Sequence, residues 1–116
     1  MMVVKRGDVW IAELGDGIGS EQQGKRPVII LQNNTGNMYS ETTIVACITS
    51  KLKKTNMPVH VELSEKFLLT NSEILLEQIR TISKNRLISR VGKVSNGIQD
   101  QIDNAILVSL GVNNAK

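Results

Sequence analysis

The chain has 116 residues, 14 basic and 11 acidic side chains, a net charge of +3 and 41% hydrophobic residues. This composition is typical of one globular domain, so we expect residues 1–116 to form a single unit, and it excludes disordered, collagen-like and membrane-embedded proteins. One cysteine and one histidine exclude an internal disulfide and a Cys/His zinc site within one chain.

The N-terminal sequence MMVVKRGD lacks the apolar stretch of a signal peptide. The longest aliphatic run, residues 28–31, is far shorter than the roughly 20 residues that a membrane span needs. We therefore expect a protein that stays in the cytoplasm and does not cross a membrane.

The first half of the chain predicts three strands. DVWIAEL at residues 8–14 lies between two glycines and predicts the first strand. Residues 15–26 contain four glycines and predict a long loop, after which PVIILQ at residues 27–32 predicts the second strand. Asparagines and a glycine at residues 33–37 predict a turn. The β-branched run TTIVACIT at residues 42–49 then predicts a central strand.

The second half predicts three further strands and a helix. VHVEL at residues 59–63 and EILLEQIRTI at residues 73–82 predict strands, with a brief helical or turn segment at residues 64–69 between them. Residues 87–94 predict a sixth strand with its basic side chains outward. The hydrophobic period then lengthens to about three and a half, which predicts a helix capped by Ser95 and stopped by Gly111.

Short consecutive strands followed by one long helix favour a mainly β fold, an antiparallel sheet curled into a small barrel, over βαβ winding. Two stretches without acidic residues, 42–61 and 78–99, are candidate phosphate-facing surfaces, although solvated lysines and arginines give the same pattern. Only three aromatic residues are present, which disfavours recognition of nucleic acid mainly by base stacking.

The inventory of reactive side chains excludes several kinds of active site. His60 stands alone, so one chain cannot carry a two-histidine ribonuclease centre. We interpret His60 as structural and Cys47, within an apolar strand, as a core thiol. The carboxylates are scattered, and Asp100 and Asp103 on one helix face are interpreted as solvated surface rather than a two-metal site.

Five segments, taken together, resemble the MazF/PemK family of bacterial toxin endoribonucleases. They are KRGDVWIAEL at residues 5–14, SEQQGKRPVII at 20–30, VACITS at 45–50, PVHVEL at 58–63 and EILLEQIRTI at 73–82. The resemblance covers nearly the whole chain, in the family's order and near the family's spacing.

The resemblance implies a small Src-homology-3-like antiparallel β-barrel of the CcdB/PemK type, with about seven strands and a C-terminal α-helix. It further implies a homodimer that cleaves single-stranded mRNA without a metal or other cofactor, leaving a 2',3'-cyclic phosphate and a 5'-hydroxyl. A cognate MazE-like antitoxin would inhibit the enzyme in the bacterial cytoplasm.

The resemblance also implies functional residues. Arg26 and Thr49 match the catalytic pair, with the Arg26 guanidinium stabilising charge on the phosphate and the Thr49 hydroxyl holding it. Residues implied to bind RNA are Ser20, Glu21 and Gln78. Independently of the resemblance, Lys51, Lys53 and Lys54 directly follow Thr49 and could guide the RNA backbone. In period-two register Gln78 shares a face with Ile74, Leu76, Arg80 and Ile82, so a barrel rim or dimer contact is its alternative role.

Two other functions stay open from the sequence. One is a toxin of the same fold that binds DNA gyrase without nuclease activity, as CcdB does, and the other is a non-catalytic RNA-binding barrel. Where many relatives have a proline-containing turn after the first strand, this chain has LGDGIGS. We therefore expect residues 15–24 to become ordered only on RNA binding.

Overall fold

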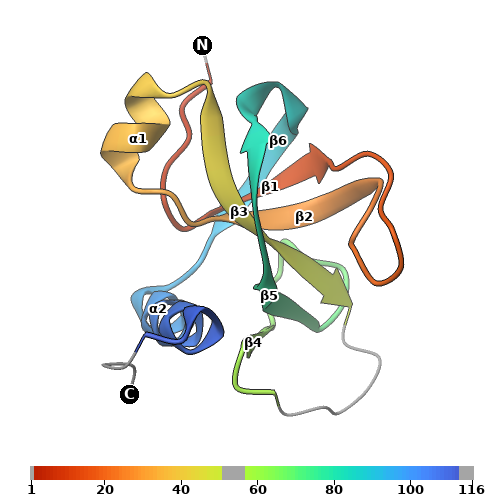
Figure 1. Cartoon of the computed structure of the whole chain (residues 1–116), viewed down its shortest axis with the longest axis vertical. Helices are drawn as coiled ribbons and strands as arrows, with labels where there is room; N and C mark the ends of the chain where they lie inside the picture. The colour runs from red at the N-terminus through yellow and green to blue at the C-terminus, as the bar shows by residue number, and fades with distance from the viewer. Residues whose placement is uncertain (1, 51–56, 113–116) are drawn as a thin grey trace.

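A computed structural model describes residues 2–50 and 57–112. These residues form one antiparallel sheet of six strands in the order β4-β5-β3-β2-β1-β6, together with two α-helices and a 3-10 helix (Figure 1). In chain order the elements are β1 (Asp8–Glu13), β2 (Lys25–Ile30), α1 (Asn34–Tyr39), β3 (Thr42–Ser50), β4 (His60–Leu63), β5 (Ser72–Ser83), the 3-10 helix (Lys84–Arg86), β6 (Leu87–Lys93) and α2 (Asn96–Leu110).

Alternating side chains along the strands build two apolar clusters, one on each face of the sheet. On β3, Ala46 and Ile48 belong to the first cluster, whereas Val45 and Cys47 belong to the second. Helix α2 covers the first cluster with its buried residues Ile102 and Ala105. The single long helix thus seals one face of the sheet.

The second cluster is enclosed by the sheet itself. It draws side chains from five strands: Trp10 and Ala12 of β1, Val28 and Ile30 of β2, Val45 and Cys47 of β3, Ile82 of β5 and Leu87 of β6. Because strands far apart in the sheet order share one cluster, the sheet curls around it, as in a small barrel. The predicted mainly β fold with a C-terminal helix is confirmed, with six strands among the described residues where the resemblance implied about seven.

Helix α2 begins and ends at the predicted residues. The Ser95 Oγ accepts a hydrogen bond from the Ile98 backbone N–H at 3.2 Å, which satisfies one of the unpaired donors of the first turn. Gly111 ends the helix in the left-handed region at φ 71°. No helix among the described residues is long and apolar enough to cross a membrane.

The turn predicted at residues 33–37 is wrong, because the chain forms the short helix α1 there. The Asn33 side chain caps this helix by accepting from the Gly36 N–H at 2.8 Å. Asn37 is buried, and its Oδ1 accepts from the Thr43 hydroxyl at 2.8 Å. Asparagines that suggest a turn in the sequence therefore cap and anchor a helical turn instead.

Asp103 lies at the surface as interpreted, with its side chain 46% exposed, but it also makes a long-range ion pair. Its carboxylate accepts from the Arg6 guanidinium at 2.6 Å and from the Gln99 amide at 2.9 Å. This ion pair joins the N-terminal segment to α2 across 97 positions of sequence, a contact that local periodicity cannot reveal. Asp100, on the same helix, is exposed.

Candidate active site

The sheet brings Arg26 and Thr49 to one cavity. Strands β2 and β3 pair antiparallel, with Val28 opposite Cys47, and Arg26 and Thr49 each lie two residues beyond that pair on the same side of the ladder. Both side chains are half-buried, and both line a cavity of about 230 Å³. Two residues that are 23 positions apart in the sequence are thus brought together by strand pairing.

The backbone around Arg26 is held in an extended conformation. Pro27 follows it, and the proline ring disfavours helical geometry for the preceding residue. Pro27 pairs with Ile11 of β1, and the Arg26 Nε donates to the Gln23 carbonyl at 3.3 Å. These contacts tie the guanidinium to the end of the β1–β2 loop, at the rim of the cavity.

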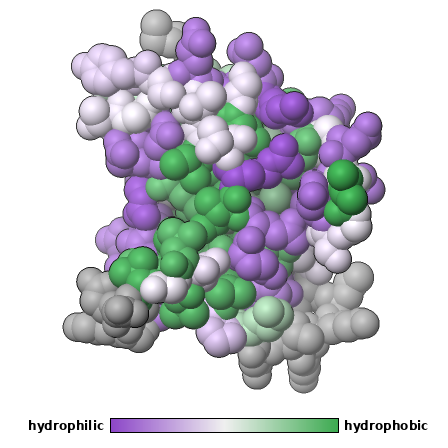
Figure 2. Space-filling model, in the orientation of Figure 1, coloured by the Kyte–Doolittle hydropathy of each residue, from purple (hydrophilic) through white to green (hydrophobic). Residues whose placement is uncertain are grey.

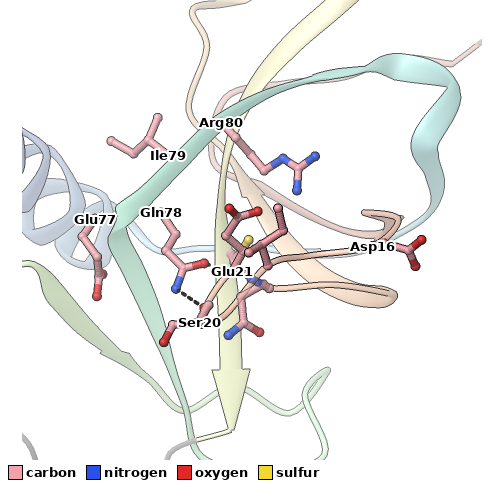
Figure 3. Close-up of a pocket in the computed structure, with 10 residues that line it drawn as sticks. Asp16, Ser20, Glu21, Glu77, Gln78, Ile79 and Arg80 are labelled. Atoms are coloured by element: carbon pink, nitrogen blue, oxygen red, sulfur yellow. Dashed lines mark hydrogen bonds between the residues drawn. The ribbon is translucent and has the colours of Figure 1, made fainter.

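A second, larger cavity of about 480 Å³ lies between the β1–β2 loop and β5. Figure 3 shows Ser20 and Glu21 of the loop facing Gln78 and Arg80 of β5. The Gln78 Nε2 donates to the Ser20 carbonyl, and its Oε1 accepts from the Gln22 N–H, each at 3.1 Å. Three predicted RNA-binding residues, Ser20, Glu21 and Gln78, therefore line one cavity.

A β-bulge places Gln78 in this cavity. Ala46 of β3 pairs with Ile79, but the next residue, Cys47, pairs with Leu75. The register shifts between these two pairs, and this irregularity changes the face on which the side chains of β5 lie. The sequence predicted one common face for Gln78, Ile74, Leu76, Arg80 and Ile82. That prediction is wrong, because Ile74 and Leu76 pack in the first apolar cluster, under α2, whereas Ile82 packs in the second apolar cluster on the opposite face of the sheet.

The Cys47 thiol is close enough to both cavities to be affected by an arginine from each, Arg26 and Arg80. It is buried and lines the larger cavity. Burial raises the pKa of the thiol above its ordinary value, and the nearby charges of Arg80 and Arg26 partly oppose this shift. Both guanidiniums thus act on a group at the larger cavity, and the net shift keeps the thiol protonated, as a core residue requires.

The structure also places the residues that the sequence interpretation set aside. The His60 Nε2 lies 2.7 Å from the Glu77 carboxylate, and its Nδ1 lies 3.5 Å from that of Glu73. Among residues 2–50 and 57–112, no three His, Cys, Asp or Glu side chains form a group able to hold a metal ion. The predicted RNA-guiding residues Lys51, Lys53 and Lys54 lie outside the described residues.

Sequence reasoning missed part of the larger cavity. Asp16 and Glu77 line it, and Arg80 contributes a guanidinium that the sequence indicated only as one of a basic stretch. The sequence signal for Arg80 was its place in the stretch 78–99, which contains no acidic residue. Its placement depends on the curvature of β5 and on the position of the β1–β2 loop.

Comparisons with known proteins identify the family of this chain. Residues 5–110 match the family described as "PemK-like, MazF-like toxin of type II toxin-antitoxin system". The chain is 49% identical to the "Endoribonuclease MazF" of Staphylococcus epidermidis over 114 residues, which cover 97% of this chain and 95% of that protein.

Solved structures share the fold at lower sequence identity. A MazF from Deinococcus radiodurans superposes with a TM-score of 0.82 at 18% identity, covering 97% of this chain and 100% of that one. A mycobacterial endoribonuclease solved in complex with its cognate antitoxin gives a TM-score of 0.79 at 23% identity, covering 94% of this chain and 96% of that one.

Proposed function

Because this chain belongs to the PemK-like, MazF-like family of toxins of type II toxin-antitoxin systems, we propose that it is an endoribonuclease that cleaves single-stranded mRNA. The observation that carries the proposal is the cavity that Arg26 and Thr49 share. It offers a guanidinium and a hydroxyl to one phosphate.

In the proposed reaction the 2'-hydroxyl of a ribose attacks the adjacent phosphorus. A bond from the 2'-oxygen to phosphorus forms as the bond to the 5'-oxygen breaks, the 2'-hydroxyl loses its proton and the leaving 5'-oxygen gains one. The products are a 2',3'-cyclic phosphate and a 5'-hydroxyl. Negative charge grows on the non-bridging oxygens during this step, and preorganised donors lower its energy.

Arg26 stabilises this charge in the proposed mechanism. A guanidinium presents its N–H donors in a planar fork that meets two phosphate oxygens at once. A guanidinium keeps its proton and is a poor proton shuttle, so the role of Arg26 is electrostatic. The Thr49 hydroxyl donates a further hydrogen bond to the phosphate. Because the guanidinium supplies the positive charge, the proposed reaction uses no metal or other cofactor.

The larger cavity is proposed to recognise RNA bases. Glu21 and Gln78 offer acceptors and donors to base edges, and Ser20 adds a hydroxyl. The Gln22 Oε1 is buried and accepts no hydrogen bond from the described part of the chain. Lys51, Lys53 and Lys54, which follow Thr49 in sequence, stay predicted contacts to the RNA backbone.

Two protein partners complete the proposal. The first is a second copy of the chain, since α2 carries the exposed apolar residues Val108 and Leu110, and Figure 2 shows a hydrophobic region where Figure 1 places α2. The second is a MazE-like antitoxin with an acidic, disordered tail that folds onto the surface around Arg26 and Arg80 and excludes RNA. Both interactions take place in the bacterial cytoplasm, where mRNA is available.

Incubation of the purified protein with long single-stranded RNA in EDTA tests the proposed activity. Discrete cuts with cyclic-phosphate and 5'-hydroxyl ends are expected. Intact RNA across varied sequences would contradict the proposal. A parallel assay of DNA gyrase inhibition would then identify a gyrase-binding toxin, and RNA binding without cleavage would identify a non-catalytic RNA-binding barrel.

A further inference from the structure

The cavity of Arg26 and Thr49 has an outer wall with no role in the proposed mechanism. Residues 67–70, from the connection between β4 and β5, close the cavity opposite the two strands and are here called the outer wall. Its side chains are Phe67, Leu68, Leu69 and Thr70.

The outer wall is held in place by packing on β6. A Cβ atom added to Gly92 would lie 2.4 Å from the Phe67 Cδ2 and 2.5 Å from its Cε2, far closer than real Cβ atoms approach other atoms. Only a glycine at this position lets the ring lie against the strand. Phe67 also packs against the apolar cluster under α2.

Hydroxyl groups anchor the far end of the outer wall. The Thr70 Oγ1 lies 3.0 Å from the Ser50 Oγ of β3, and the Ser72 hydroxyl donates to the Thr70 carbonyl at 3.0 Å. Ser50 directly follows Thr49. The outer wall is thus fixed relative to the proposed catalytic pair at both of its ends.

The chemistry of this cavity suits one nucleoside. Its apolar lining includes Pro27, Phe67 and Leu69, and the Leu69 side chain is 104% exposed although it borders the cavity. At about 230 Å³ the cavity is smaller than the roughly 300–1,000 Å³ that holds a drug-sized ligand. An apolar surface of this size beside a guanidinium matches a flat base whose phosphate lies at Arg26.

We propose that the outer wall forms a nucleoside subsite in which the base next to the scissile phosphate lies against Leu69 and Phe67. Gly92 is a positioning residue, because it sets the place of the Phe67 ring and hence of the outer wall. This inference rests on the proposed endoribonuclease function and adds the group that orients the RNA at the reacting phosphate.

Leu69→Ser is the direct test, because a fully exposed side chain contributes little to folding. Met38→Ser is the matched control, since Met38 is 67% exposed on α1 and lines neither cavity. The readouts are KM and kcat at a mapped cleavage site, and Kd for a mixed-sequence oligonucleotide without 2'-hydroxyls. Loss of the apolar Leu69 side chain is expected to raise both Kd and KM about tenfold, with kcat changed less than about threefold. Met38→Ser is expected to change neither Kd nor KM.

Gly92→Ala tests the positioning role. The added Cβ is expected to displace Phe67 and raise KM and Kd as Leu69→Ser does. Gly97→Ala is the matched control, since its Cβ would meet no atom closer than 4.0 Å. Thermal unfolding of every variant separates loss of fold from loss of the subsite.

The outcomes separate the two proposals. Wild-type cleavage with unchanged KM and Kd in Leu69→Ser overturns the subsite and leaves the proposed function intact. If Gly92→Ala does not fold, Leu69→Ser and Phe67→Ala test the subsite instead. An unchanged Kd in both of these variants overturns the inference. If the wild type does not cleave RNA, the proposed function fails, and the Kd values alone then support or overturn the subsite.

Discussion

Replacement of Gln78 tests whether its side chain holds the β1–β2 loop against β5. The amide makes two hydrogen bonds of 3.1 Å to the loop, one from the Gln22 N–H and one to the Ser20 carbonyl. A neutral hydrogen bond contributes about 0.5–1.5 kcal/mol net. Gln78→Ala removes both bonds and should therefore raise loop opening by about 5- to 150-fold, which corresponds to about 1–3 kcal/mol.

Hydrogen exchange of the Gln22 amide measures this opening. Gln78→Glu is an informative second variant, because its carboxylate still accepts from Gln22 but cannot donate to Ser20 and repels that carbonyl, so a smaller increase is expected. The Gly24 amide, which donates to the Gly15 carbonyl at 2.9 Å, is an internal control that should not change. Equal Gln22 exchange in wild type and Gln78→Ala would refute the reasoning.

Three further predictions concern the active site, helix α2 and the core. Thr49→Ala is expected to lower the single-turnover cleavage rate by about 10²–10³, since it removes one preorganised donor to the phosphate; a rate within a factor of three of wild type would rule out this role. Ser95→Ala should lower the free energy of unfolding by about 1 kcal/mol through loss of the N-cap, measured by urea denaturation, and should not change cleavage while the protein is folded. Because burial raises the pKa of Cys47 in the folded state, stability that is fully present below about pH 8.5 should be lost as the pH rises. The free energy of unfolding should therefore fall more steeply from about pH 8 to about pH 10 in wild type than in Cys47→Ala, and parallel slopes would contradict this.

Local sequence patterns were sufficient for most of the elements. Ser95 and Gly111 are the cap and stop of α2 because capping depends on the side chain and backbone of single residues. The asparagines before β3 were misread, because Asn37 is committed to a buried hydrogen bond with Thr43 that no local pattern contains.

For the candidate site, too, local motifs were informative, whereas contacts between distant segments could not be predicted. The motif SEQQGKRP and the end of VACIT indicated Arg26 and Thr49, and strand pairing brings them to one cavity. The face of Gln78 could not be predicted, because the bulge on β5 exists only in its pairing with β3. Arg80 and the outer wall were missed for a related reason, since their positions depend on contacts between distant segments.

The single-turnover rate of RNA cleavage by Arg26→Ala, beside wild type and Arg26→Lys, tests the central claim most directly. If the Arg26 guanidinium stabilises the charge that develops on the phosphate, the rate at a mapped site should fall by at least about 10²–10³ in Arg26→Ala. Arg26→Lys keeps the charge but loses the planar fork, so its rate should lie between the two. A rate for Arg26→Ala equal to that of wild type, in protein shown to be folded, would contradict the assignment of this cavity as the active site.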